Sequence, residues 1–167
     1  MDMKVGEAMA GQGDHKVHIN LLLGSRAGPV GHAFATALAS PRPGHIPFLV
    51  VLRPNVPVRP PTLFVNKAEI RGEPHGTISW GAGEAGIAEG IREALKAGAL
   101  AGEDLDDLVM IVSVWIDWAV ADEAAVLRNT REAMRTALLR VDGKEQYAGD
   151  FLDETLDAFN SNFAMQE

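Results

Sequence analysis

One candidate acid–base residue is a histidine in a strand-like segment near the N-terminus. Between residues 17 and 22, three aliphatic residues alternate with His18, Asn20 and Leu22. Because successive side chains of a strand point to opposite faces, this alternation places His18 and Asn20 together, away from the aliphatic face. An imidazole titrates near neutral pH and can donate or accept a proton there. His18 is therefore a candidate catalytic acid or base, and the competing interpretation is a histidine held in place for structural reasons.

A second candidate is Lys67, which interrupts the otherwise apolar stretch 62–70. On a strand, Leu63, Val65, Lys67 and Glu69 share one face. One interpretation is a cation at the wall of a cleft, oriented by the carboxylate of Glu69. The other is a lysine on an edge strand, where its charge opposes aggregation. The spacing alone favours the edge-strand interpretation.

A glycine-rich motif and the remaining histidines indicate less. Gly81, Gly83 and Gly86 fit the G-x-G-x-x-G pattern of dinucleotide-binding loops. However, the strand expected before them is short, and Glu84 would place a carboxylate beside the pyrophosphate. A helix start whose glycines allow close backbone approach explains the motif better. The histidines at positions 15, 32, 45 and 75 show no metal-binding spacing, and we expect them to be solvated.

Composition narrows the class of protein. The 167 residues include 15 Lys and Arg against 23 Asp and Glu, and the formal net charge of −8 disfavours nucleic acids and anionic membranes as partners. There are no cysteines, which excludes disulfides, thiolate catalysis and zinc–thiolate sites. No apolar run is long enough to span a bilayer, and the N-terminus lacks a signal-peptide pattern. We therefore expect a cytoplasmic protein.

Local patterns predict the elements that position these residues. Strands are expected at 16–23, 48–53, 62–70, 77–80 and 106–116, and helices at 28–40, 81–96 and 122–141. The continuous apolar run at 48–53 predicts a buried strand, and four prolines within 54–61 predict an extended, rigid connector after it. Several strands followed by helix, strand and helix predict an α+β two-layer domain.

The C-terminal part of the chain is expected to be separate from this domain. Leu152, Leu156, Phe159 and Phe163 recur at spacings of 4, 3 and 4, which predicts a short amphipathic helix. We therefore divide the chain into a domain at 1–141 and a tail at 142–167. The tail is expected to dock on the body or on a neighbouring subunit.

Several segments together resemble the formaldehyde-activating enzyme family of methylotrophs and methanogens. Val5-Gly6-Glu7-Ala8, the strand VHINLLLG at 17–24, and Gly28-Pro29 with the helix after it follow the family pattern. The segment VLRPNVPVRP at 51–60 is similar to the family's AVLAPNLPVKP, and DDLVMIVSVWI at 106–116 is similar to its DDLVIIVSVFIH. The order and spacing of these segments carry the resemblance from about Val5 to about Val141.

The resemblance implies a lyase of one-carbon metabolism that condenses formaldehyde with tetrahydromethanopterin to the methylene derivative and water. It also implies the fold of the second domain of ribosomal protein S5 and a homopentamer with the pterin bound between subunits. No metal or tightly bound cofactor is implied, because the pterin is a co-substrate. His18 falls on the family's catalytic acid, and the substrate-binding positions fall on Asn20, Leu49, Lys67, Glu69 and Glu84.

Three of these positions differ from the family pattern. Asn20 stands where the family has aspartate, Glu69 where it has threonine, and Glu84 where it has glutamine. An alternative of another class therefore stays open: a non-catalytic homologue that binds a pterin or an aldehyde as a carrier or sensor. The acceptor also stays open between tetrahydromethanopterin and another reduced pterin.

Overall fold

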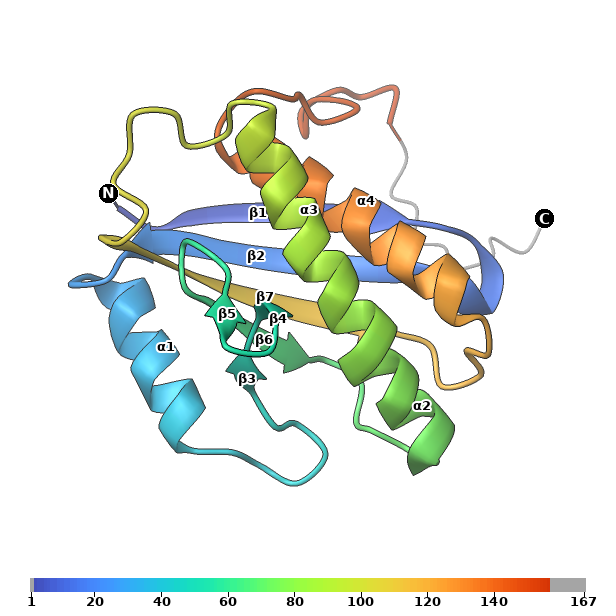
Figure 1. The fold of residues 1–167 in the computed structure, drawn as a ribbon. Helices are drawn as coiled ribbons and strands as arrows, with labels where there is room; N and C mark the ends of the chain where they lie inside the picture. Colours follow the sequence, from blue (N-terminus) through green and yellow to red (C-terminus); the bar gives the residue numbers. More distant parts are fainter. Residues whose placement is uncertain (1, 157–167) are drawn as a thin grey trace.

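The computed structural model describes residues 2–156, and a five-stranded sheet lies at its centre (Figure 1). The strand order is β1-β2-β7-β6-β3. The strands are β1 (Lys4–Ala10), β2 (Val17–Ser25), β7 (Leu108–Ile116), β6 (Thr62–Asn66) and β3 (Phe48–Leu49). Neighbours are antiparallel except β6 and β7, which run parallel. A mixed sheet with helices confirms the expected α+β class.

Helices pack on both faces of this sheet. The helices α3 (Glu84–Lys96) and α4 (Glu123–Val141) lie side by side across one face, and α1 (Pro29–Ala39) lies against the other (Figure 1). The expected two-layer arrangement therefore has a partial third layer. Since α1 covers only one end of its face, the other end is left without a helix.

The alternation of side chains along β2 explains why helices pack on both faces of the sheet. Val17, Ile19, Leu21 and Leu23 are fully buried in the main core beneath α3 and α4. Leu22 points to the opposite face and packs into a smaller cluster with Phe34 and Ala37 of α1 and with Val65 of β6. His18 and Asn20 share the face of Leu22, as the alternation predicts.

Two helix ends follow from local sequence signals. Asp122 caps α4: its side chain accepts a hydrogen bond from the Ala125 N–H at 2.9 Å, and this bond lowers the pKa of the carboxyl. After α3, the Ala99 N–H donates to the Ala94 carbonyl while Gly98 adopts a φ of 93°, the left-handed C-cap that glycine favours.

The prediction of one buried strand at 48–53 is wrong. The run divides at Val50: β3 pairs with β6 in the main sheet, whereas β4 (Val51–Arg53) pairs with β5 (Val56–Pro57) in a separate hairpin. Of the six residues only Val50 is fully buried, because the run leaves the edge of the sheet there. The proline-rich segment is correspondingly a hairpin turn with Asn55 at a φ of 67°, rather than a connector without strand pairing.

The expected strands at 77–80 and at 67–70 are not present. The helix α2 (Gly72–Ile78) continues through a single π-helical segment (Ser79–Gly83) into α3, and β6 ends at Asn66. The G-x-G-x-x-G motif therefore lies inside a continuous helix, which excludes a phosphate-binding loop. Its close-approach interpretation holds at Gly86, where a Cβ would lie 2.7 Å from the Cβ of Thr130 on α4.

Within the expected tail, residues 142–156 carry turns and bends, so the predicted amphipathic helix is not present at Leu152 and Leu156. Phe159 and Phe163, the other half of the predicted amphipathic helix, lie outside the described residues. The tail touches the sheet through Tyr147, whose hydroxyl accepts a hydrogen bond from the Glu7 N–H at 3.3 Å. The Glu7 carbonyl accepts a bond from Arg140 of α4 at 3.2 Å. The free edge of β1 is thus covered at Glu7.

Candidate active site

His18 is held by a carboxylate from the neighbouring strand. On β1 the Cα partner of His18 is Met9, and that of Asn20 is Glu7. The Glu7 side chain lies diagonally across from the imidazole, and its Oε1 lies 2.8 Å from His18 Nε2. Both side chains are about one-third to one-half exposed, on the end of the sheet face that α1 leaves uncovered. Because a carboxylate only accepts, Nε2 carries the hydrogen and Nδ1 is the nitrogen available for proton transfer.

Asn20 and Lys67 meet on the same face, although 47 positions separate them in the chain. Lys67 Nζ donates to Asn20 Oδ1 at 2.5 Å. The Lys67 backbone N–H donates to the Val114 carbonyl of β7 at 2.7 Å, which fixes the lysine just past the end of β6. Lys67 therefore does not lie on an edge strand: it follows β6, an inner strand of the sheet that ends at Asn66. The ammonium group of Lys67 contacts the amide of Asn20 rather than the carboxylate of Glu69.

Two tryptophans lie at the end of β7, and one of them is next to His18. Trp115 of β7 is the Cα partner of His18, so its ring stands on the same face of the sheet. The Nζ of Lys16 lies 5.7 Å from the centre of that ring. Trp118 follows β7, stacks beneath the Arg71 guanidinium at 4.0 Å and donates from its indole N–H to the Glu69 carbonyl. Such rings offer flat apolar surface for a planar heterocycle.

Leu49 and Glu69 lie nearer the opposite edge of the sheet. Leu49 is paired with Leu63 on β6 and is 43% exposed. Three strand spacings separate β3 from β2, which amounts to about 14 Å across the sheet. Glu69 is exposed in the loop after β6. Its side chain lies against Gly44, because a Cβ built on that glycine would lie 2.5 Å from Glu69 Cγ. One chain therefore does not bring Leu49 into contact with His18.

Glu84 lies at the start of α3, on the helix-covered side of the sheet. Its Oε1 accepts a hydrogen bond from the Val51 N–H at 2.6 Å, which ties α3 to the hairpin strand β4. Burial raises the pKa of the Glu84 carboxyl, and the Val51 hydrogen bond opposes this in part. The structure thus groups His18, Asn20 and Lys67 on one face and places Glu84 apart from them.

Glu7 is the residue that sequence reasoning missed. The segment Lys4–Ala10 contains two alanines and a glycine, a weak β-former set, and it was not expected to be a strand. The available signal was that Glu7 belongs to the Val5-Gly6-Glu7-Ala8 segment, which follows the family pattern. Only the register of β1 on β2 puts its carboxylate beside the imidazole.

The other histidines and acids form no ion site in the described part of the chain. Among residues 2–156, no group of three or more His, Asp or Glu side chains is arranged to hold a metal ion. The expectation that His75 is solvated is wrong: it is 2% exposed, its Nδ1 accepts from the Arg71 N–H, and its Nε2 lies 3.3 Å from the Ile116 carbonyl oxygen.

No helix in this part of the chain is both long and apolar enough to cross a bilayer.

Comparisons with known proteins bear on this site. The sequence profile of the family described as "Formaldehyde-activating enzyme (Fae)" matches residues 5–154. The chain is 40% identical over 136 residues to the "5,6,7,8-tetrahydromethanopterin hydro-lyase" of Methanosarcina barkeri, covering 81% of this chain and 76% of that protein. It is 36% identical over 138 residues to the "Bifunctional enzyme Fae/Hps" of Methanococcoides burtonii, covering 83% of this chain. The match spans only 35% of that bifunctional protein's length.

Proposed function

The chain belongs to the formaldehyde-activating enzyme family, and on this premise we propose that it is a lyase that condenses formaldehyde with tetrahydromethanopterin, giving the methylene derivative and water. The observation that carries the proposal is the Glu7–His18 pair beside the Asn20–Lys67 contact, on an uncovered end of the sheet. It supplies a proton donor and a cation on one accessible face.

His18 acts as the acid of a two-stage condensation. One amine N–H of the pterin adds across the formaldehyde C=O bond and gives a carbinolamine. His18, in its imidazolium form, then gives its Nδ1 proton to the hydroxyl group, water leaves, and an iminium ion remains. The second amine attacks the iminium carbon and returns its proton to Nδ1, so that the histidine ends as it began. Glu7 holds Nε2–H throughout and keeps Nδ1 directed at the reacting carbon.

Lys67 and Asn20 bind the pterin beside this acid. With Oδ1 of Asn20 occupied by Lys67, its amide NH₂ is the group that faces the ligand as a donor. Lys67 adds positive charge, which suits a ligand bearing carbonyl or anionic groups. Leu49 and Glu69 contact the pterin from the edge of a sheet, and Glu84 from the start of α3.

The separation of these residues supports a site shared between subunits. Leu49 and Glu84 flank the β3–β4 edge, away from His18. We propose that one subunit supplies His18, Asn20 and Lys67, and that its neighbour in a homopentamer supplies the β3–β4 edge. A site enclosed in this way would exclude water and favour capture of the iminium by the second amine over hydrolysis.

We further propose that the chain has the fold of the second domain of ribosomal protein S5, with a domain at 1–141 and a tail at 142–167. We also propose a cytoplasmic location and a role in methylotrophic one-carbon metabolism. The mixed sheet with α3 and α4 on one face supports the fold. Sedimentation equilibrium tests the assembly, since a monomer would contradict the shared site.

A stopped-flow measurement of methylene-pterin formation tests the function. The protein should accelerate the reaction of formaldehyde with tetrahydromethanopterin over the uncatalysed rate, and tetrahydrofolate serves as the alternative acceptor. His18→Ala should lower the catalysed rate about 10²- to 10⁴-fold, the usual worth of a positioned acid. His32→Ala, at an exposed position on α1, is the matched control. Pterin binding without acceleration would instead identify a carrier or sensor, and activity that survives His18→Ala would refute the acid assignment.

A further inference from the structure

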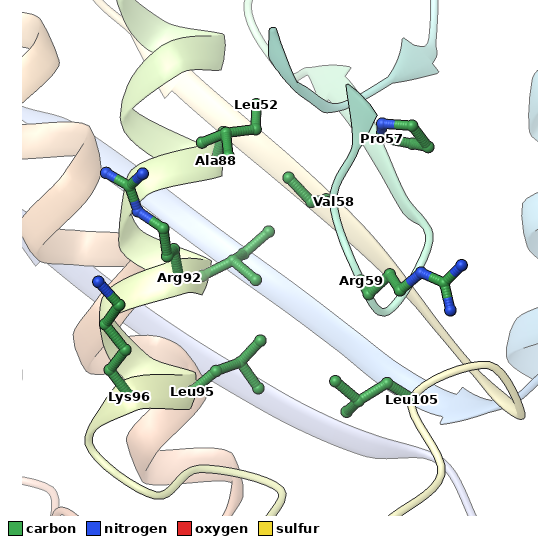
Figure 2. Close-up of a pocket in the computed structure, with 10 residues that line it drawn as sticks. Leu52, Pro57, Val58, Arg59, Ala88, Arg92, Leu95, Lys96 and Leu105 are labelled. Carbon is green, nitrogen blue, oxygen red and sulfur yellow. The ribbon is translucent and has the colours of Figure 1, made fainter. Parts of the chain in front are cut away.

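A groove runs between α3 and the β4–β5 hairpin (Figure 2). It lies on the face of the sheet that α3 and α4 cover, opposite the face of His18. It encloses about 420 Å³. Its apolar lining comes from the hairpin, the helix and the loop before β7, namely Leu52, Pro57, Val58, Ala88, Ile91, Leu95 and Leu105. Leu52 is 39% exposed at its mouth. An exposed apolar recess of this kind is a candidate binding surface.

The rim of the groove is basic. Arg59, Arg92 and Lys96 border it, and Arg53 borders the smaller recess beside it, which shares Leu52 and Arg92. Two carboxylates lie among them: Asp106 pairs with Arg59, and Glu89 lies 3.9 Å from Arg92. Four cations against two carboxylates leave positive charge at this rim, although the chain as a whole is acidic. The groove therefore suits an apolar segment that carries acidic residues.

The C-terminal segment, residues 150–167, has this composition. It contains five acidic residues and no lysine or arginine. In its described part, Phe151 is 98% exposed, Leu152 79% and Leu156 54%. Phe159, Phe163 and Met165 extend the apolar content in sequence beyond the described residues. Exposed side chains of this size on one segment indicate an apolar partner surface.

We propose that the groove between α3 and the β4–β5 hairpin is the docking site of the chain's own C-terminal segment, residues 150–167. The apolar side chains of the segment fill the recess, and its carboxylates meet Arg53, Arg92 and Lys96. The 20 residues that follow Tyr147 extend up to about 66 Å, which exceeds the roughly 40 Å diameter expected of a folded chain of this length. The segment is therefore long enough to reach the groove of its own subunit.

The absence of cysteine makes a direct test possible in the full-length chain. A Leu95→Cys variant places one thiol in the groove, and its rate of reaction with a maleimide reports whether the groove is covered. Replacing Phe151, Leu152 and Leu156 by serine in the same chain should raise this rate about tenfold or more, since the covering segment then opens freely. These side chains are exposed, so the substitutions leave the core intact.

Two additions make the result specific. A Leu38→Cys variant, whose thiol lies on α1 away from the groove, should react at the same rate with either form of the segment. A synthetic peptide of residues 150–167 should restore protection of the Leu95→Cys thiol in the serine variant, and a scrambled peptide should not. Protection that persists in the serine variant would mean that something else covers the groove, and a thiol that is never protected would mean an open groove. Either result overturns the proposal.

Discussion

Removal of the Glu7 carboxylate should slow the reaction by a small and calculable factor. In the structure Glu7 Oε1 lies 2.8 Å from His18 Nε2, with the two side chains 45% and 32% exposed. A buried hydrogen bond to a charged group is worth about 1.5–3 kcal/mol, and partial exposure to water reduces this to about 1 kcal/mol. If that energy holds the imidazole in its productive orientation, Glu7→Ala should lower kcat about fivefold, because 1.4 kcal/mol corresponds to tenfold.

The assay is stopped-flow methylene-pterin formation at saturating pterin, with kcat and KM determined separately. Glu7→Gln keeps an acceptor oxygen for Nε2–H and should retain more of the rate than Glu7→Ala. The stability of both variants should be close to that of the parent, because the side chain is half exposed and its backbone contacts with Tyr147 and Arg140 remain. A kcat unchanged within twofold in Glu7→Ala, or a rise in KM with kcat intact, would refute the positioning role.

Three further outcomes follow from the packing and charges. Gly86→Ala should destabilise the fold by about 1–2 kcal/mol in urea unfolding, since the new Cβ would lie 2.7 Å from Thr130 Cβ. The cost of overpacking, about 1–3 kcal/mol, outweighs the gain in helix propensity. Gly81→Ala is the control and should not destabilise the fold, because a Cβ there would have nothing within 4 Å. Burial raises the folded-state pKa of Glu84, so the contribution of its protonated carboxyl to folding stability is present at acid pH and is lost as the pH rises through that pKa. Glu84→Gln should therefore gain stability relative to the parent between acid and neutral pH in parallel unfolding titrations. A stability difference between the two proteins that does not change with pH would contradict this. Asn20→Asp should convert the contact with Lys67 into an exposed ion pair worth at most about 1 kcal/mol, seen as a stability gain that disappears in high salt, and a gain that survives salt would need another cause.

Several elements could be predicted because their signals are local. The alternation at 17–22, the apolar run at 108–116 and the helical pattern at 122–141 each lie within one segment, and the structure has β2, β7 and α4 at these places. The face shared by His18 and Asn20 follows from the same alternation. These predictions needed no knowledge of what each element packs against.

Other elements were predicted wrongly because their neighbours decide them. The apolar run at 48–53 looks like one buried strand, but it crosses the sheet edge at Val50, where one half pairs with β6 and the other with β5. The segment 77–80 looks like a short strand before a helix that begins at Gly81, yet it lies within one continuous helix, and Gly86 allows that helix to approach α4 closely. The hydrophobic periodicity of a segment does not indicate where a sheet edge or a helix–helix contact lies.

The sequence by itself determined which residues can do chemistry here, namely an imidazole and an amide on one face of a strand and a lysine in a second segment. It also carried the resemblance to the formaldehyde-activating enzymes. Only the tertiary structure decided that Glu7 holds His18, that Lys67 meets Asn20, and that Leu49 and Glu84 lie apart from both. The physical reason is strand register. The pairing of β1 with β2, and of β6 with β7 across more than 40 residues, results from burying all the apolar faces at once, and no single segment encodes it.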